Sequence, residues 1–545
     1  MEAIGWPDAY ARSYREAGYW QDRPLGVFLA EHARTLGDKT ALVTEHGSIT
    51  YVELDRRAAA LARGLVALGL GRGDHIVVQL PNTEDFFVVL FAVLRIGVIP
   101  VLGLPAYRRS EAVHLARHSS AVAYVLPATD PSSGYDYRTL ADEVTAEVPT
   151  LSHVLVAGAP GRHTALAAVE QAGEQGPAPA TAEPDSAAPA VLLVSGGTTG
   201  LPKLIPRTHN DYAYNIRASA QVCGFGPDTV YLAALPVAHN FALSCPGALG
   251  ALLVGGTVVL APSPDPDTVF PLIEHHKVTA TAVVPPLAAL WSQAVEWATE
   301  DLGSLALLQV GGARLSPDVA RRVRAGLGCE LQQVFGMAEG LLCMTRPGYA
   351  PERVDTTQGR PLCPDDELRV VDEDRRDVPP GGTGELLTRG PYTLRGYYRA
   401  PEHNKTAFTA DGFYRTGDLV RLTADGDIVV EGRKKDLVNR GGDKVSADEI
   451  EEHLRAHPGI LDAAVVPVPD EYLGERTCAW VVPREGRAGL DVAGLDSFLD
   501  ERGVADYKKP DLVHLVDALP VTGVGKVDKR TLARRAAEAA GRPRP

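Results

Sequence analysis

The sequence has few cysteines, no closely paired cysteines and no long uninterrupted apolar run. Its 545 residues include six cysteines, and no two of them form a C-x-x-C pair. A zinc knuckle, a dithiol redox motif and a disulfide framework are therefore not predicted, and scattered buried thiols are expected. The most apolar stretch, residues 86–104, is interrupted by Arg95 and Pro100. It predicts a buried helix followed by a buried strand rather than a membrane span.

Positive charge is also scarce. The chain carries 54 Lys and Arg against 69 Asp and Glu, a net charge of −15. Such an acidic balance disfavours non-specific binding to nucleic acid. The N-terminus lacks the basic start and apolar core of a secretory signal. We therefore expect a cytoplasmic protein with neither a nucleic-acid nor a membrane partner.

Short apolar runs alternate with amphipathic windows through the first three-quarters of the chain. The runs are rich in β-branched residues and bounded by Gly or Pro, as in HIVVQL (75–80), VAYVLP (122–127), AVLLVSG (190–196), GGTVVLAP (255–262) and ATAVVPP (280–286). Between several of them lie helical patterns such as residues 51–70. Strands that are apolar throughout and alternate with helices indicate an α/β fold with parallel sheets covered on both faces.

Three segments depart from this alternation. Residues 157–190 are rich in Ala, Pro and Gly, which predicts a surface excursion or connector. Residues 364–431 carry short alternating strands and favour a smaller antiparallel sheet or barrel. The chain after Arg433 predicts a separate α+β unit, with a helix over 446–457 capped by Ser446 and a second helix over 490–502.

The strongest local motif follows the apolar run AVLLV directly. It reads Ser195-Gly196-Gly197-Thr198-Thr199-Gly200-Leu201-Pro202-Lys203. Its glycines allow backbone N–H groups to wrap an anion, its hydroxyls add donors and its lysine adds charge. The spacing is not that of a Walker A loop. Taken alone, the motif also fits an ordinary Gly-rich turn.

Further motifs follow in a fixed order: FGMAE at 335–339, YRTGD at 414–418, GRKKD at 432–436 and PVTGVGK at 520–526. Together with the 195–203 loop they resemble the core motifs of the adenylate-forming superfamily. That superfamily includes acyl- and aryl-CoA ligases, adenylation domains of nonribosomal peptide synthetases and firefly-type luciferases. The resemblance extends nearly from end to end.

Longer segments narrow the resemblance to stand-alone aryl acid–AMP ligases of siderophore and aryl-capped peptide assembly. These segments are KLIPRTHNDY (203–212), PVAHNFALSCPGALG (236–250), LLQVGGARLSP (307–317), LQQVFGMAEGLL (331–342), TRGPYTLRGYY (388–398) and VNRGGDKV (438–445). The resemblance implies a large N-terminal domain of two parallel-type sheets with helices and a small β-barrel-like subdomain. It also implies a small mobile α+β C-terminal domain. The expected boundaries are 1–432 and 433–545, with a hinge near Lys435.

The resemblance implies two half-reactions. An aryl carboxylate and ATP give aryl-AMP and pyrophosphate with Mg²⁺. The phosphopantetheine thiol of an aryl carrier protein, acting in trans, then takes the aryl group. Lys526 would neutralise the approaching carboxylate and α-phosphate, Glu339 would bind Mg²⁺, and Asp418 and Arg433 would bind the ribose. The remaining nucleotide contacts implied are Ser195, Gly196, Gly197, Thr198, Thr199, Gly200, Lys203, Gly312, Ala313, Val334, Phe335, Gly336, Met337 and Ala338.

The resemblance also implies an aryl pocket. Asn240 stands where amino-acid-activating relatives carry an Asp, which fits a substrate without an α-amino group. His239 resembles a histidine near the substrate carboxylate, and Phe241 would stack beside the ring. Gly311 would also line the pocket. Cys245 and Leu342 match the pattern of salicylate enzymes, whereas dihydroxybenzoate enzymes tend to carry Ser and Val.

Several alternatives stay open on the sequence. The acid is expected to be salicylate, but 2,3-dihydroxybenzoate, 3-hydroxypicolinate and quinaldate-type acids fit similar pockets. An aryl-CoA ligase that uses free coenzyme A would carry the same motifs. A catalytically silent nucleotide-binding relative is disfavoured by Lys203, Glu339, Asp418 and Lys526, which are all present.

Overall fold

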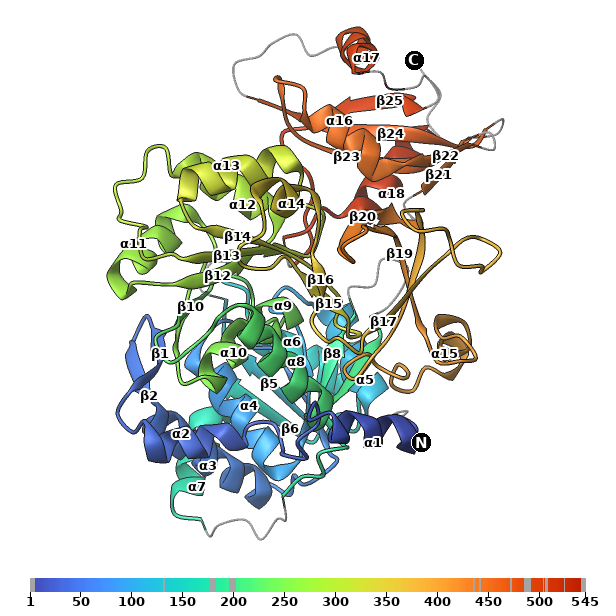
Figure 1. Cartoon of the computed structure of the whole chain (residues 1–545). Helices are drawn as coiled ribbons and strands as arrows, with labels where there is room; N and C mark the ends of the chain where they lie inside the picture. The colour runs from blue at the N-terminus through green and yellow to red at the C-terminus, as the bar shows by residue number, and fades with distance from the viewer. Residues whose placement is uncertain are drawn as a thin grey trace.

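The computed structural model shows a large N-terminal unit with a small C-terminal unit seated on it (Figure 1). The structure describes residues 5–130, 133–176, 183–195, 202–434, 437–440, 443–470, 473–484, 492–502, 504, 508–523 and 525–540. Within these ranges no helix is both long and apolar enough to cross a membrane. All six cysteines are free thiols, and all except the half-buried Cys223 are buried.

A seven-stranded sheet forms the base of the large unit. Its order is β7-β6-β5-β3-β4-β8-β9, and only β9 is antiparallel to its neighbour. Apolar side chains occupy both faces because helices cover both, which explains the runs without polar alternation. The strands are β3 (His75–Val78), β4 (Ile99–Leu102), β5 (Ala123–Pro127), β6 (His153–Ala157), β7 (Thr164–Ala165), β8 (Pro189–Val194) and β9 (Leu204–Thr208).

A nine-stranded sheet lies above it, in the order β16-β15-β14-β13-β12-β10-β11-β1-β2. Its central strands, from β14 to β1, are parallel to one another. The strands are β1 (Thr40–Thr44), β2 (Gly47–Thr50), β10 (Val230–Ala233), β11 (Thr257–Leu260), β12 (Ala280–Val283), β13 (Leu307–Gly311), β14 (Glu330–Gly336), β15 (Leu342–Met344) and β16 (Arg360–Pro361). The predicted pair of parallel-type sheets is confirmed.

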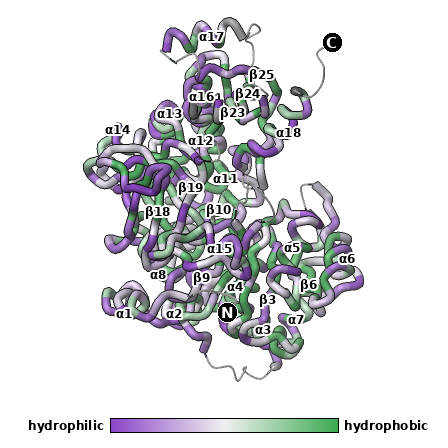
Figure 2. Tube along the Cα trace, turned by 90° about the vertical axis from the view of Figure 1, so that its right-hand side faces the viewer, coloured by the Kyte–Doolittle hydropathy of each residue, from purple (hydrophilic) through white to green (hydrophobic). Residues whose placement is uncertain are grey.

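The largest apolar core lies between the two sheets and includes buried residues from both sheets and from the helices between them. These helices include α3 (Tyr51–Ala67), α4 (Glu84–Ile96), α8 (His209–Val222) and α10 (Gly247–Leu253). Helix α4 is apolar over residues 86–94 because these residues are all buried, and β4 follows it, as residues 86–104 predicted. Figure 2 shows hydrophobic chain in the interior and hydrophilic chain in peripheral helices such as α1 (Asp8–Glu16).

Further helices cover the outer faces of both sheets. Helices α11 (Pro266–His276), α12 (Pro285–Ala294) and α13 (Pro317–Leu327) cover the nine-stranded sheet, and α5 (Arg109–Ser119) and α6 (Tyr137–Glu147) cover the seven-stranded sheet. The N-terminal helix α2 (Val27–Thr35) packs on α3, and α14 (Pro351–Thr356) packs on α13.

A four-stranded antiparallel sheet joins the large unit to the small one, which confirms the prediction for residues 364–431. It consists of β17 (Glu367–Val371), β18 (Gly384–Arg389), β19 (Tyr414–Leu422) and β20 (Ile428–Arg433), with α15 (Pro401–Ala407) beside it. In Figure 1 this sheet lies directly below the C-terminal unit.

The C-terminal unit is an α+β fold built on its own sheet. The sheet contains β21 (Leu437–Arg440), β22 (Asp443–Ser446), β23 (Ile460–Asp470), β24 (Gly474–Pro483) and β25 (Leu512–Leu515). Its helices are α16 (Ala447–Arg455), α17 (Val492–Glu501) and α18 (Lys529–Ala540). Ser446 caps α16 as predicted, because its hydroxyl accepts a hydrogen bond from the Glu449 amide.

The interpretation of residues 157–190 as a surface excursion is wrong for part of that segment. It contains β7 and helix α7 (Leu166–Glu174), which packs on α3. The contact is close, since a Cβ added at Gly173 would collide with the Ala60 carbonyl oxygen. The Ala- and Gly-rich composition that suggested a loop therefore serves helix-to-helix packing at Gly64 and Gly173.

A buried ion pair connects the core to the loop after β14. Arg207 and Asp211 are both completely buried, and Arg207 Nε donates to Asp211 Oδ1 at 2.6 Å. Arg207 Nη1 also donates to the Ala338 carbonyl at 3.0 Å. Asp211 in turn accepts from the Thr208 amide at the start of α8. One guanidinium thus ties α8 to the residue that precedes Glu339.

We expect Arg207→Leu to lower the free energy of unfolding by about 3–5 kcal/mol, because it leaves the Asp211 carboxylate buried without a partner. Adding Asp211→Asn should recover part of the loss of unfolding free energy. The amide oxygen can still accept the hydrogen bond from the Thr208 amide at the start of α8, and the buried charge is removed. Urea denaturation of both variants measures this. Equal stability of Arg207→Leu and the wild type would contradict the assignment.

Candidate active site

A cavity of about 2380 Å³ opens where the carboxyl ends of β8, β10, β12, β13 and β14 face the small sheet and the C-terminal unit. Ligand sites of open parallel sheets form at this edge. Its lining includes most of the predicted site residues: Ser195, Lys203, His239, Asn240, Phe241, Cys245, Gly312, Ala313, Val334, Phe335, Gly336, Met337, Ala338, Glu339, Leu342, Asp418, Arg433 and Lys526.

The other predicted residues do not line it in the described part of the chain. Gly311 lies beneath the surface, where an added Cβ would be 3.0 Å from the Phe241 ring and 2.9 Å from the Val334 carbonyl oxygen. The backbone at Gly311 therefore packs closely under Phe241. Residues outside the described ranges are Gly196, Gly197, Thr198, Thr199 and Gly200 of the 195–203 motif, and Lys435, near which the hinge is expected.

Lys526 enters the cavity from the C-terminal unit. Its side chain lies against Gly312, whose backbone has φ +87°, and an ideal Cβ there would be 2.9 Å from Lys526 Cε. Glycine is therefore required at 312 by both the backbone conformation and the close approach. Burial, and next the positive charge of Arg433, lower the pKa of the Lys526 ammonium to about 8, although Asp418 and Glu339 act in the opposite direction.

Asp418 and Arg433 face each other across neighbouring strands. They are register partners on β19 and β20, and Arg433 Nε donates to Asp418 Oδ1 at 2.8 Å. The Asp418 carboxylate is almost completely buried. The pairing fixes the orientation of a carboxylate that can accept hydrogen bonds from ligand hydroxyls.

Glu339 belongs to a buried hydroxyl chain that the motifs alone did not indicate. Glu339 Oε1 accepts from Tyr397 Oη at 2.7 Å, and Tyr397 Oη lies 2.9 Å from Tyr414 Oη. Burial, and then the Glu339 charge, raise the pKa of both phenols, so they stay protonated. Lys203 Nζ lies 5.8 Å from the centre of the Tyr397 ring. Tyr397 and Tyr414 both stand inside quoted motifs, GYY and YRTGD, which is the signal that could have found them.

Neutral side chains line the opposite end of the cavity. Asn240 Oδ1 accepts hydrogen bonds from Tyr212 Oη at 2.9 Å and from Ser244 Oγ at 2.8 Å. These bonds fix the amide so that Nδ2 points to the Cys245 sulfur at 3.5 Å. Tyr212 was not predicted as a site residue.

Two other groups at this end are uncharged. Burial, with a smaller effect of Lys526, lowers the pKa of His239 to about 3, and burial raises that of the Cys245 thiol to about 12. Phe241 and Leu342 are buried and line the same cavity. Leu342 lies directly against Gly336, where any larger side chain would collide with it. This end can therefore accept a flat apolar group.

The two ends of the cavity suit different chemistry. Lys203 and Arg433 bring positive charge to one end, where a polyanion can bind. Asn240, Phe241 and Leu342 form a neutral slot at the other end. Lys526 lies between the two ends. Its ammonium lowers the pKa of His239 at the neutral end, and Asp418 and Glu339 at the charged end raise the pKa of Lys526 itself. The arrangement suits joining a small organic acid to a phosphate centre.

A divalent cation fits only together with a bound polyanion. Among the described residues, no group of three or more His, Cys, Asp or Glu side chains could hold a metal ion. Glu339 offers one carboxylate in the cavity, held by Tyr397 through Oε1. Mg²⁺ characteristically takes one or two carboxylates and completes its shell with substrate phosphates and water. The residues present fit that mode.

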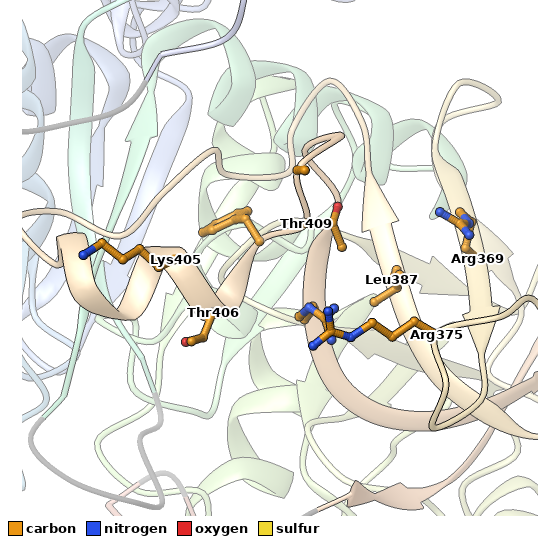
Figure 3. A pocket seen from close by; sticks show the side chains of 9 residues that line it. Arg369, Arg375, Leu387, Lys405, Thr406 and Thr409 are labelled. Carbon is orange, nitrogen blue, oxygen red and sulfur yellow. The ribbon is translucent and has the colours of Figure 1, made fainter.

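A second cavity, of about 580 Å³, lies over the small antiparallel sheet and α15 (Figure 3). Arg369, Arg375, Lys405 and Arg415 line it. Three of these cations already face carboxylates, in the pairs Arg369–Asp377, Lys405–Glu402 and Arg415–Glu385. The charge there is largely balanced within the fold, so this cavity does not rival the first as an anion site.

Comparison with known proteins agrees with the geometry. Residues 29–398 match the family described as AMP-binding enzyme, and residues 449–526 match the AMP-binding enzyme C-terminal domain. The chain is 52% identical over 527 residues to the 2,3-dihydroxybenzoate-AMP ligase of Bacillus subtilis, covering 97% of this chain and 96% of that protein. It is 51% identical over 544 residues to the salicyl-AMP ligase / salicyl-S-ArCP synthetase of Mycobacterium tuberculosis, covering 99% and 95%.

The fold is also that of a solved relative. The apo structure of MbtA from Mycobacterium smegmatis superposes with a TM-score of 0.77 at 50% sequence identity, covering 98% of this chain and 99% of that chain.

The lowered pKa of Lys526 predicts a pH-dependent affinity for a nucleotide phosphate. As pH rises from 7 to 9, the ammonium loses its proton, so AMP should bind about tenfold more weakly, because a hydrogen bond to a charged group contributes about 1.5–3 kcal/mol. Lys526→Arg should keep its affinity over this range, since a guanidinium stays protonated. Calorimetric titration at both pH values tests this, and an equal decline in both proteins would contradict it.

Proposed function

The chain belongs to the AMP-binding enzyme family of adenylate-forming ligases, and on that premise we propose that it activates an aryl carboxylic acid, with salicylate as the preferred substrate. In the proposed reaction ATP converts the acid to aryl-AMP and pyrophosphate. The aryl group then passes to the phosphopantetheine thiol of an aryl carrier protein. The six free thiols support a reducing, cytoplasmic location.

One observation carries the proposal. Lys526, supplied by the C-terminal unit, reaches the same cavity as Asp418, Glu339 and Lys203 of the large unit. It lies beside Gly312 at the carboxyl end of β13, close to the neutral slot that holds Asn240. A cation at this position can contact a carboxylate in the slot and a phosphate beyond it.

In the first step a carboxylate oxygen of the acid attacks the α-phosphorus of ATP. A new P–O bond forms, and the bond to the β-phosphate bridging oxygen breaks, so pyrophosphate leaves with its electron pair. Lys526 neutralises the two anions as they approach and the charge that develops on phosphorus. Asp418, held by Arg433, accepts hydrogen bonds from the ribose hydroxyls. The remainder of the nucleotide lies along Ala313 and residues 334–338.

Mg²⁺ completes the proposed site, with Glu339 as its protein ligand. When bound, it would neutralise charge on the phosphate oxygens. Tyr397 keeps the Glu339 carboxylate in place through its 2.7 Å hydrogen bond, and Tyr414 supports Tyr397 in turn. Lys203 and the loop that begins at Ser195 hold the outer phosphates.

In the second step the carrier thiol sulfur attacks the carbonyl carbon of aryl-AMP. The C–O bond to phosphate breaks, AMP leaves, and the thiol proton passes to solvent. We propose that residues 1–432 and 433–545 act as the two moving bodies, with a hinge near Lys435. Lys526 lies in the cavity against Gly312, which supports assigning this orientation of the C-terminal unit to the first step.

Salicylate is proposed on the strength of the slot. The Asn240 amide is fixed by Tyr212 and Ser244, with Nδ2 directed to the Cys245 sulfur at the edge of the slot. Cys245 and Leu342 border the slot with a weak hydrogen-bond partner and an apolar branch, which suits a ring edge without a 3-hydroxyl. 2,3-Dihydroxybenzoate is the second candidate, since the chain is equally similar to ligases named for each acid.

The direct test is ATP–pyrophosphate exchange with a panel of aryl acids, followed by acyl transfer to a purified aryl carrier protein or to coenzyme A. We expect exchange with salicylate and transfer to the carrier. Exchange followed by transfer to coenzyme A alone would replace the carrier assignment with an aryl-CoA ligase. Absence of exchange with every aryl acid would reject the proposed function.

We expect Lys526→Ala to lower the rate of aryl-AMP formation by at least about a hundredfold, because an interaction with developing charge is lost. Transfer from supplied aryl-AMP to the carrier should change much less. Single-turnover measurement of each half-reaction provides the comparison. An equal loss in both would contradict the role proposed for Lys526.

The slot predicts the selectivity. We expect salicylate to exceed 2,3-dihydroxybenzoate by roughly ten- to a hundredfold in kcat/KM, because an apolar pocket rejects an added hydroxyl only weakly. Benzoate should be poorer than salicylate, since Asn240 would lose its ortho-hydroxyl partner.

The double variant Cys245→Ser with Leu342→Val should raise activity on dihydroxybenzoate by supplying a hydrogen-bond partner and space. Cys363→Ser, which changes a buried thiol that does not line the cavity, is the matched control. A wild type that prefers dihydroxybenzoate, or a double variant with unchanged selectivity, would show that these two positions do not determine the substrate.

A further inference from the structure

An ion pair connects the two units beside the active-site cavity. Arg314 Nη2, in the large unit, lies 3.3 Å from Glu452 Oε2 on α16 of the C-terminal unit. The two side chains are 25% and 38% exposed, so solvent only partly screens the attraction. Both residues line the cavity. Neither was among the residues that the motifs indicated.

The position of Arg314 in the chain gives this pair its significance. Arg314 follows Gly312 by two residues, and Gly312 is the backbone against which the Lys526 side chain lies. Glu452 belongs to α16, in the same unit as Lys526. The pair therefore spans the boundary at the same edge of the large unit where Lys526 must be inserted. A shift of the C-terminal unit that separated the pair would also move Lys526 away from Gly312.

Other charges around α16 are consistent with an attraction toward Arg314. Burial alone would raise the pKa of Asp448, but Lys529 first, and then Arg455 and Arg314, lower it. Lys529 also pairs with Asp448 at 3.0 Å and with Glu451 at 2.7 Å, within the C-terminal unit. Arg314 thus attracts two carboxylates of α16 from across the boundary, Glu452 in an ion pair and Asp448 at longer range.

The neighbouring arginines of the large unit do not offer the same attraction. Arg321 pairs with Asp318 within its own helix α13. Burial lowers the pKa of Arg322, and the like charge of Arg484 in the C-terminal unit lowers it further. Arg322 is therefore repelled across the boundary by Arg484. Packing contacts at the boundary, such as Gly523 on Ala106 and Gly525 on Val284, are not charged. Among the described residues beside α13 and α16, the attraction across the boundary therefore resides in the Arg314–Glu452 pair.

We propose that Arg314 is a positioning residue for Lys526: its ion pair with Glu452 favours the orientation of the C-terminal unit in which Lys526 occupies the cavity. The inference deepens the proposed function and rests on it. Arg314 acts through Lys526 and not on the nucleotide. Its removal should therefore lower the rate of aryl-AMP formation without weakening the binding of ATP.

The test is a double-mutant cycle on aryl-AMP formation at low ionic strength. We expect Arg314→Gln and Glu452→Gln each to lower kcat about two- to fivefold, the range for a partly exposed ion pair, with the KM for ATP unchanged. In a Lys526→Ala background, Arg314→Gln should cause no further loss, because there is no lysine left to position. Arg314→Lys should retain most of the wild-type rate.

Arg321→Gln is the matched control, since it removes an arginine of the same rim whose partner lies in its own helix. It should leave the rate unchanged. Raising the salt concentration should lower the wild-type rate toward that of Arg314→Gln, because exposed charges are screened. Thermal unfolding of each variant shows whether a loss of folded protein contributes.

Three results would overturn the inference. They are a wild-type rate in Arg314→Gln, a full further loss when Arg314→Gln is added to Lys526→Ala, and a raised KM for ATP that identifies Arg314 as a nucleotide ligand. Each presupposes a wild-type protein that supports exchange. Absence of exchange in the wild type would instead reject the proposed function, so the two failures are distinguishable.

Discussion

The structure depends on one close approach, the contact between the Lys526 side chain and the backbone of Gly312. It brings a cation from the small unit to the carboxyl end of a strand in the large unit. The approach is possible because residue 312 has no side chain and a left-handed backbone conformation. It also removes water from the ammonium, which explains the lowered pKa of Lys526. Geometry and electrostatics at the centre of the cavity thus have a common cause.

The rest of the site keeps charged groups in fixed positions around that lysine. Asp418 is held by Arg433 across two strands, and Glu339 is held by a chain of two tyrosine hydroxyls. Behind Glu339, the buried Arg207–Asp211 pair holds the Ala338 carbonyl. Each of these carboxylates therefore has a fixed hydrogen-bond partner. Such preorganisation reduces the rearrangement needed when charge develops on phosphorus.

The neutral end of the cavity is held by hydrogen bonds between uncharged side chains instead of by ion pairs. Asn240 is oriented by Tyr212 and Ser244, and apolar side chains line the space beside it. Burial keeps His239 neutral and Cys245 protonated, so no full charge competes for the substrate ring. A site divided in this way can bind a polyanion and an aromatic acid side by side, with Lys526 between them.

The sequence by itself determined the fold class and the chemistry. Apolar runs without polar alternation required sheets buried on both faces, and motif order indicated adenylate formation before any geometry was known. The Ala- and Gly-rich composition of residues 157–190 could not distinguish a loop from the packed helix α7. Small residues occur both in loops and where two helices pack closely. Tertiary structure alone placed Gly311 beneath Phe241, joined Tyr397 and Tyr414 to Glu339, and set Arg314 opposite Glu452. These contacts join residues 17 to 138 positions apart in the sequence, one of them across the boundary between the two units. No local pattern in a chain records which distant side chains will meet.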